Sequence, residues 1–188
     1  NVLYLTLQIS NGIIFNIKYL GECFMINILF CDDNPEFLSI MCGDVRDIIQ
    51  NDYRKNFKDA KFYSYDNGSE VISFAERDRI DAIFLDIDMK DLTGFETAKR
   101  LLEINGETLI LFVSAYDQFV YDAFEFYPIA FLRKGKIRDE LPKAVKRICA
   151  ILNEPNEMIT VTATDGKINI RKKDIVYIHS IGNYCYYF

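Results

Sequence analysis

Three aspartates stand where apolar runs end, and this spacing points to chemistry more plainly than any other feature of the sequence. Asp86 follows the run 82–85, and Asp32 and Asp33 follow the run 26–31. If both runs are buried parallel strands, their carboxyl ends meet at one edge of an open α/β sheet, where such folds place their sites. Two carboxylates at roughly 4 to 5 Å repel each other by about 3 to 4 kcal/mol at an effective dielectric near 20, so the cluster needs a cation. Hard oxygen ligands favour Mg²⁺.

The segments that would hold these aspartates alternate between strand and helix patterns. Asn34 and Pro35 offer an N-cap followed by proline at the first helical position. Apolar spacing predicts strands at 26–31, 61–65, 82–87, 109–113 and 129–132, and helices at about 35–51, 69–76, 94–104, 116–126 and 137–152. Strict alternation of this kind predicts an α/β fold with a doubly wound, five-stranded parallel sheet.

Composition bounds the class of protein. The chain has 188 residues, of which 50% are hydrophobic and 27% charged, and a formal net charge of −6. This length suffices for one ordinary domain and part of another. The negative net charge argues against binding of a polyanion along the whole chain. The five cysteines show no C-x-x-C spacing, which favours reduced core thiols and a cytoplasmic location. No apolar run reaches the length of a membrane span, and the first residues lack the basic region of a signal peptide.

The first 24 residues lack the helix caps and turn signals found further along. The chain begins with Asn1, and Met25 directly precedes the first strand of the predicted sheet. Gly21 and Glu22 can be encoded by a purine-rich, ribosome-binding type of sequence just upstream of this methionine. We therefore expect residues 1–24 to be a mistranslated upstream leader. The alternative is a genuine extra strand within 2–9 or 13–17.

Several motifs follow one another in order along the chain: Asp32-Asp33 after the first strand, Asp86 in FLDID with Gly94 eight residues on, Ser114 in FVSAYD, the aromatic Phe131, and Lys134. With these motifs, the chain from Met25 to about Asn153 resembles the receiver domain of two-component response regulators, which has a flavodoxin-like fold. We expect this domain at 25–152. The region after Ser114 is most similar to the LytTR branch of these regulators.

The resemblance implies that a sensor histidine kinase phosphorylates Asp86, which faces the phosphoryl donor as a nucleophile. Lys134 would supply a cation and Ser114 a hydroxyl to the phosphoryl oxygens, and Phe131 would be the aromatic switch. The Mg²⁺ ligands would be Asp32, Asp33, Asp86 and the backbone carbonyl of Asp88. A homodimer on phosphorylation is the implied assembly.

Two positions depart from the receiver pattern. Gly135 follows Lys134 where the family usually has proline, and Lys90 replaces a common proline four residues after Asp86. Neither change removes a reacting group. We therefore expect altered loop dynamics and phosphoryl lifetime rather than lost chemistry.

Beyond the receiver, the chain changes character. Residues 153–157 are polar and include Pro155, as in a linker, and residues 158–188 have β-rich patterns. This last part resembles the opening strands of a LytTR DNA-binding domain that is incomplete at Phe188. By that resemblance, a loop around Ser180, Asn183 and Tyr184 would approach DNA.

The prediction is therefore a cytoplasmic transcription regulator with no membrane partner, and not an enzyme. Two alternatives remain open. Asp86 and Asp88 after a buried strand are also similar to the start of the haloacid dehalogenase phosphatases, although Lys90 stands where that motif has Thr or Val. The second alternative is a stand-alone receiver that acts by binding another protein.

Overall fold

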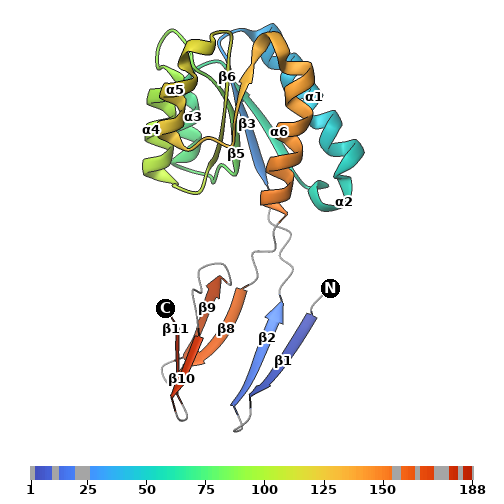
Figure 1. The fold of residues 1–188 in the computed structure, drawn as a ribbon, viewed down its shortest axis with the longest axis vertical. Coiled ribbons are helices and arrows are strands. Elements are labelled where there is room, and N and C mark those ends of the chain that lie inside the picture. Colours follow the sequence, from blue (N-terminus) through green and yellow to red (C-terminus); the bar gives the residue numbers. More distant parts are fainter. Residues whose placement is uncertain are drawn as a thin grey trace. The chain divides into compact units, whose positions relative to one another are not determined.

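Figure 1 shows the computed structural model of the chain. Backbone and side chains are described for residues 26–153, and backbone alone for strands at 3–9, 13–19, 158–163, 166–171, 178–181 and 184–187. The chain divides into two compact units, one spanning Phe24–Asn153 and the other formed by Asn1–Cys23 and Glu154–Phe188.

The larger unit is built on a parallel sheet of five strands in the order β4-β3-β5-β6-β7. Its strands are β3 (Asn27–Cys31), β4 (Lys61–Tyr65), β5 (Ala82–Asp86), β6 (Leu109–Ser114) and β7 (Ala130–Arg133). Every residue of β5 is buried, as expected for a strand covered on both faces. The predicted doubly wound α/β fold is confirmed.

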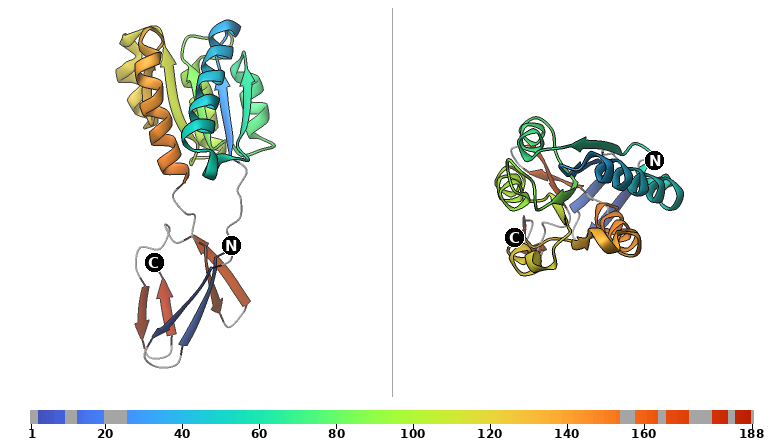
Figure 2. Two further views of the ribbon diagram at one scale, coloured as in Figure 1. Left: turned by 90° about the vertical axis from the view of Figure 1, so that its right-hand side faces the viewer. Right: turned by 90° about the horizontal axis from the view of Figure 1, so that it is seen from above.

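Helices cover both faces of this sheet (Figures 1 and 2). One face carries α1 (Pro35–Asp52) and α6 (Ile137–Leu152), and the other carries α3 (Gly68–Ala75), α4 (Gly94–Ile104) and α5 (Val120–Ala123). A further short helix, α2 (Arg54–Phe57), follows α1 and was not predicted. Asn34 caps α1 as expected, since its side chain accepts hydrogen bonds from the backbone N–H groups of Glu36 and Phe37.

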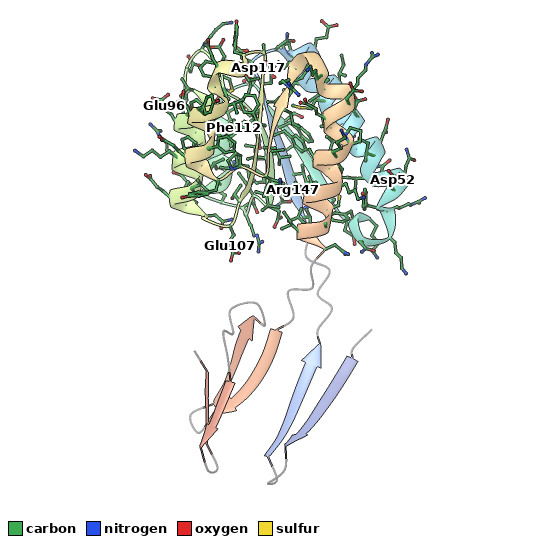
Figure 3. The ribbon with its side chains drawn as sticks, viewed as in Figure 1. Asp52, Glu96, Glu107, Phe112, Asp117 and Arg147 are labelled. Atoms are coloured by element: carbon green, nitrogen blue, oxygen red, sulfur yellow. The ribbon has the colours of Figure 1, made fainter. Side chains whose placement is uncertain are left out.

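Two apolar layers hold the helices on the sheet. Under α1 and α6, the rings of Phe30 and Phe84 stack with centroids 5.1 Å apart. On the opposite face, Phe112 packs against Phe95 and other aromatic rings. Figure 3 shows Phe112 inside this layer and Glu96 on the outer side. The strands thus form a rigid support for the residues that follow their carboxyl ends.

The predicted helix at 116–126 is wrong in its detail. This segment consists of a 3₁₀ turn at Asp117–Phe119, the short α5, and a second 3₁₀ turn at Phe124–Phe126. The apolar spacing is helical, but the segment is rich in aromatic residues, which are weaker helix formers than alanine or leucine. Tyr127 then has a left-handed φ of 47°, and Pro128 follows. A continuous α-helix therefore does not form here.

The cysteines with described side chains are Cys31, Cys42 and Cys149, and all three are free. Burial raises the pKa of the Cys31 and Cys149 thiols to about 12, so both stay protonated at neutral pH. Cys31 and Cys149 lie in the core as expected, while the reduced state of the thiols stays a prediction. None of the described helices has the length and apolar character needed to cross a membrane.

The second unit consists of antiparallel hairpins. Near the amino end, β1 (Leu3–Ile9) pairs with β2 (Ile13–Tyr19). The backbone therefore agrees with the extra-strand alternative for this segment, while its origin as a leader stays a prediction. The remaining hairpins are β8 (Met158–Ala163) with β9 (Gly166–Arg171), and β10 (Ile178–Ile181) with β11 (Tyr184–Tyr187). Most of the predicted linker, residues 154–157, lies outside the described residues.

Candidate functional site

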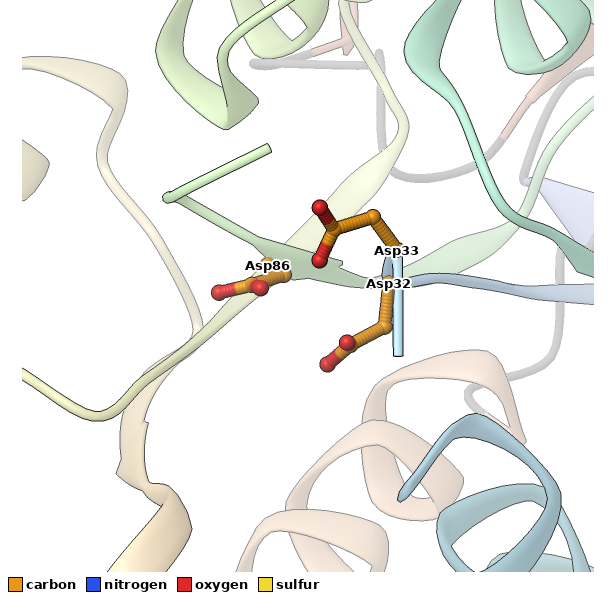
Figure 4. Close-up of side chains that lie close together, drawn as sticks. All are labelled: Asp32, Asp33 and Asp86. Atoms are coloured by element: carbon orange, nitrogen blue, oxygen red, sulfur yellow. The ribbon is translucent and has the colours of Figure 1, made fainter. Parts of the chain in front are cut away.

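Three carboxylates meet at the carboxyl edge of the parallel sheet. β3 and β5 are neighbours, with Cys31 opposite Leu85, so the residues that end these strands are brought together. One carboxylate oxygen from each of Asp32, Asp33 and Asp86 lies within 4.8 Å of the others. Figure 4 shows the three side chains projecting from the two strand ends into the same space. The predicted cluster is present.

Asp32 is the most deeply buried of the three, with no exposed surface. Its Oδ1 accepts a hydrogen bond from the backbone N–H of Asn34, at 2.9 Å. Its Oδ2 lies 2.7 Å from Lys134 Nζ as an ion pair, but accepts no hydrogen bond of good geometry. A buried carboxylate oxygen with unused lone pairs is suited to bind a cation.

Lys134 brings the positive charge to this cluster from the end of β7. Its Nζ donates a hydrogen bond to Asp86 Oδ2 at 2.8 Å, while the Phe37 ring centroid lies 4.9 Å from the same nitrogen. Desolvation lowers the pKa of Lys134, but the hydrogen bond to Asp86 and the negative charges of Asp86 and Asp32 outweigh this effect, and the pKa is raised overall. Lys134 is therefore a permanent cation at neutral pH. Sequence patterns gave no sign of the contact with Phe37.

The charge balance of the cluster fits a divalent cation. Three ionised carboxylates and one ammonium leave a formal charge of −2. Lys90 lies 3.7 Å from Asp33, but its side chain is 89% exposed, so water screens its charge. An all-oxygen donor set with a net negative charge is what Mg²⁺ prefers. The residues present therefore fit the predicted metal.

Asp86 combines burial with a nearby cation. Burial raises the pKa of its carboxyl, and the hydrogen bond and charge of Lys134 oppose this rise only in part. Its Oδ1 accepts a long hydrogen bond, 3.4 Å, from the backbone N–H of Asp88. The side chain of Asp88 itself is exposed, and the predicted role of its carbonyl as a metal ligand stays a prediction.

Gly94 permits the close approach of α4 to the end of β5. A Cβ at this position would collide with the carbonyl oxygen of Asp86 and lie 2.7 Å from Ile87 Cα. The Gly94 N–H donates to the Ile87 carbonyl at 3.0 Å, and Thr93 and Glu96 form a capping box. Any larger residue would therefore displace the backbone that carries Asp86.

Ser114 and Phe131 lie on neighbouring strands, β6 and β7. Ser114 ends β6, is buried, and accepts a hydrogen bond from the Tyr116 N–H at 3.1 Å. Phe131 is half-buried, stands opposite Phe112 in the sheet register, and packs on the layer under α3 and α4. No hydrogen bond is described between Ser114 and the carboxylates, so its predicted role and that of Phe131 stay predictions.

The expected loop placement of the predicted DNA-contact residues requires a correction, while their role in DNA binding stays a prediction. Ser180 and Tyr184 were expected in a loop, but the backbone places Ser180 in β10 and Tyr184 in β11, where Ile181 pairs with Tyr184. Asn183 lies outside the described residues. Regular β pairing therefore includes two of the three residues that were expected in the loop.

Comparison with known proteins agrees with this fold. The family model of the response regulator receiver domain matches residues 28–146. An uncharacterized response regulatory protein of Vibrio cholerae is 38% identical over 85 residues, covering 45% of this chain and 33% of that protein. The sensory transduction protein LytR of Streptococcus mutans is 30% identical over 124 residues, covering 57% and 51%. The positive alginate biosynthesis regulatory protein of Pseudomonas aeruginosa is 29% identical over 125 residues, covering 65% and 46%.

Solved structures share the fold at low sequence identity. The response regulator TrrA from Thermotoga maritima, in complex with Mg²⁺-BeF, is 22% identical with a TM-score of 0.55, covering 66% of this chain and 99% of that one. The response regulatory domain of MrkE from Klebsiella pneumoniae is 19% identical with a TM-score of 0.54, covering 67% and 97%. The chain spans about half or less of the length of the three curated relatives. Because the family model matches most of the chain, this protein belongs to the response regulator receiver domain family.

Proposed function

We propose that this protein is a response regulator that accepts a phosphoryl group on Asp86 from a sensor histidine kinase. One observation carries the proposal: the Asp86 carboxylate lies at the sheet edge 2.8 Å from Lys134 Nζ, with Asp32 and Asp33 beside it. A carboxylate is a weak nucleophile, and it attacks phosphorus when the donor is held in line and the charge on the equatorial oxygens is neutralised.

The proposed step transfers phosphorus from nitrogen to oxygen. An Asp86 oxygen forms a bond to phosphorus while the bond to the kinase imidazole nitrogen breaks, and the electron pair of that bond returns to the imidazole. Lys134 already contacts Asp86 Oδ2, so its ammonium is placed to attract the phosphoryl oxygens as the product forms. Ser114 Oγ accepts from Tyr116 N–H, and its hydroxyl hydrogen is then available to a phosphoryl oxygen.

Asp32, Asp33, Asp86 and the Asp88 carbonyl would hold Mg²⁺. When bound, this ion supplies Lewis-acid neutralisation of charge on the phosphoryl oxygens. The three carboxylate oxygens within 4.8 Å of one another and the formal charge of −2 that remains beside Lys134 support this assignment.

The proposed output is a change in the receiver surface near β6 and β7, which then controls transcription. Movement of Ser114 toward the phosphoryl group would leave space for the half-buried Phe131, which lies on the neighbouring strand. We assign the receiver to residues 25–152, and residues 158–188 to the start of a LytTR-type DNA-binding domain. The similarity to a sensory transduction protein and to a regulatory protein of alginate biosynthesis supports a regulatory output. We further propose that the protein is cytoplasmic, binds DNA and dimerises on phosphorylation.

Intact-mass measurement tests the phosphorylation site. The 188-residue chain is incubated with Mg²⁺ and acetyl phosphate, beside Asp86→Asn. We expect one phosphoryl adduct that requires Mg²⁺, is removed by hydroxylamine, and does not form on the variant. A folded protein without an adduct would refute the proposal, and rapid turnover of varied phosphate esters would favour a phosphatase instead.

A further inference from the structure

The segment that carries Lys134 joins β7 to α6 without any residue of its own that restricts the backbone. Lys134 begins a 3₁₀ turn, Lys134–Lys136, which has no side-chain cap. A Cβ added to Gly135 would meet nothing within 4 Å, so packing does not hold this position either. Glycine leaves φ free, whereas proline would fix it. Apart from the pairing of β7 with β6, in which Arg133 stands opposite Ser114, the position of Lys134 therefore depends on contacts from other elements.

Glu140 provides such a contact. Its Oε2 accepts a hydrogen bond from the backbone N–H of Arg133 at 2.8 Å, and its Oε1 accepts from Arg133 Nε at 2.8 Å and also from Nη2. The carboxylate thus binds both the main chain and the side chain of the residue directly before Lys134. Charge-assisted hydrogen bonds of this kind are stronger than those between neutral groups.

The helix that carries Glu140, α6, is packed on the core of the domain. Glu140 lies in the first turn of α6, where a negative charge is favoured by the helix dipole. The next residue, Leu141, is 2% exposed, and Val145 one turn later is fully buried in the layer under α6. Through Glu140, the backbone at residue 133 is therefore anchored to a helix that is itself fixed on the core.

The position of the Lys134 backbone matters because of what its side chain must reach. Nζ lies 2.7 Å from Asp32 Oδ2 and 2.8 Å from Asp86 Oδ2, so a small displacement lengthens one or both contacts. A lysine has a flexible four-carbon stem and loses side-chain entropy when it is held in one place. A misplacement of about 1 Å in an active site can cost roughly 100-fold in rate.

We propose that Glu140 is a positioning residue for phosphoryl transfer, which holds Lys134 between Asp32 and Asp86 by anchoring the Arg133 peptide N–H. The inference rests on the proposed function of Asp86. The hydrogen bonds described for Glu140 all go to Arg133, so it acts through the backbone and does not touch the reacting atoms.

The opposite end of the sheet offers a matched control. Asp81 Oδ2 accepts from the backbone N–H of Asn27 at 2.9 Å, and Asp81 Oδ1 pairs with Arg79 Nε at 2.8 Å. This contact has the same chemistry as the one at Glu140, but it lies at the amino ends of the strands. Asp81→Ala therefore removes an equivalent carboxylate without affecting the edge that carries Lys134.

The first experiment compares rates of adduct formation with Mg²⁺ and acetyl phosphate in the 188-residue chain. We expect Glu140→Ala to slow phosphorylation by about 10-fold or more, and Asp81→Ala to change it by less than about twofold. Glu140→Gln should recover most of the rate, because its amide oxygen can still accept the Arg133 N–H. Equal rates for Glu140→Ala and the wild type, or equal losses in both alanine variants, would overturn the proposal.

A double variant separates positioning from general destabilisation. If Glu140 acts through Lys134, adding Glu140→Ala to Lys134→Met should slow phosphorylation no further than Lys134→Met alone. Full additivity of the two losses would contradict the inference.

A second readout does not depend on phosphorylation. The two ε-proton NMR resonances of Lys134 should be resolved in the wild type and in Asp81→Ala, where the side chain is held, and should merge in Glu140→Ala. Absence of an adduct on the wild type would refute the proposed function, while unchanged ε-proton resonances in Glu140→Ala would refute the positioning role separately.

Discussion

Replacing Lys134 by methionine should destabilise the protein strongly at neutral pH without Mg²⁺. Lys134 Nζ lies 2.7 Å from Asp32 and 2.8 Å from Asp86, and each pair attracts by about 6 kcal/mol at an effective dielectric of 20. Desolvation of the ammonium, several kcal/mol, and about 2 kcal/mol of side-chain entropy oppose this gain. Removal of one partner from a buried pair costs about 3 to 5 kcal/mol, because the remaining charges stay buried. We expect the free energy of unfolding to fall by this amount.

The free energy of unfolding that is lost in Lys134→Met should be larger at neutral pH than at acidic pH. Burial raises the pKa of Asp86 above its ordinary value of 3.8, with Lys134 opposing the rise. A carboxyl whose pKa is raised on folding binds its proton more tightly in the folded protein than in the unfolded chain. Its contribution to stability is therefore fully present below the unfolded pKa of 3.8, and it is lost as the pH rises through the folded pKa. Without Lys134 that pKa rises further. The difference between variant and wild type should therefore shrink as the pH falls toward 4.

Urea unfolding followed by circular dichroism measures this effect at pH 7 and near pH 4, in EDTA and in Mg²⁺. Mg²⁺ at about 100 times its dissociation constant would return about 2.7 kcal/mol to the variant. Lys136→Met, which removes an exposed lysine two residues away, is the control and should change little. If Lys134→Met unfolds at the same urea concentration as the wild type at pH 7 in EDTA, our reasoning about the carboxylate cluster is wrong.

Variants at three further positions test other parts of the structure. Lys90→Ala removes the cation that lies 3.7 Å from Asp33 and competes with Mg²⁺ for this carboxylate. In calorimetric titration, Mg²⁺ binding should become tighter by about 1.5- to 5-fold, the range expected for an exposed ion pair. Weaker binding would contradict this expectation. Gly94→Ala places a Cβ against the Asp86 carbonyl and should lower the free energy of unfolding in urea by about 1 to 3 kcal/mol. An unchanged unfolding midpoint would show that the loop moves to accommodate the Cβ. Asn34→Ala removes the cap of α1 and should cost about 0.5 to 2 kcal/mol, while Asn34→Asp should retain most of the stability.

Local sequence patterns determined the order of elements and the chemistry available at the sheet edge. The apolar runs before Asp32 and Asp86 are continuous because both faces of their strands are covered, and a continuous run can be recognised without knowing what covers it. Asn34 and Pro35 marked the start of α1 because capping is a contact within four residues. The resemblance to receivers then indicated Lys134 as the partner of Asp86.

Only the tertiary structure decided how these groups contact one another. Lys134 and Asp86 are 48 residues apart, and their distance depends on strand order, register and helix packing together. The hydrogen bonds of Glu140 to Arg133 depend on where α6 begins relative to β7, and two residues seven apart have no periodic signature. The broken helix around α5 likewise follows from the aromatic packing and the left-handed Tyr127, whereas apolar spacing alone predicted a continuous helix. Local patterns are set by neighbours in the chain, and the contacts between distant residues are set by the packing of the whole domain.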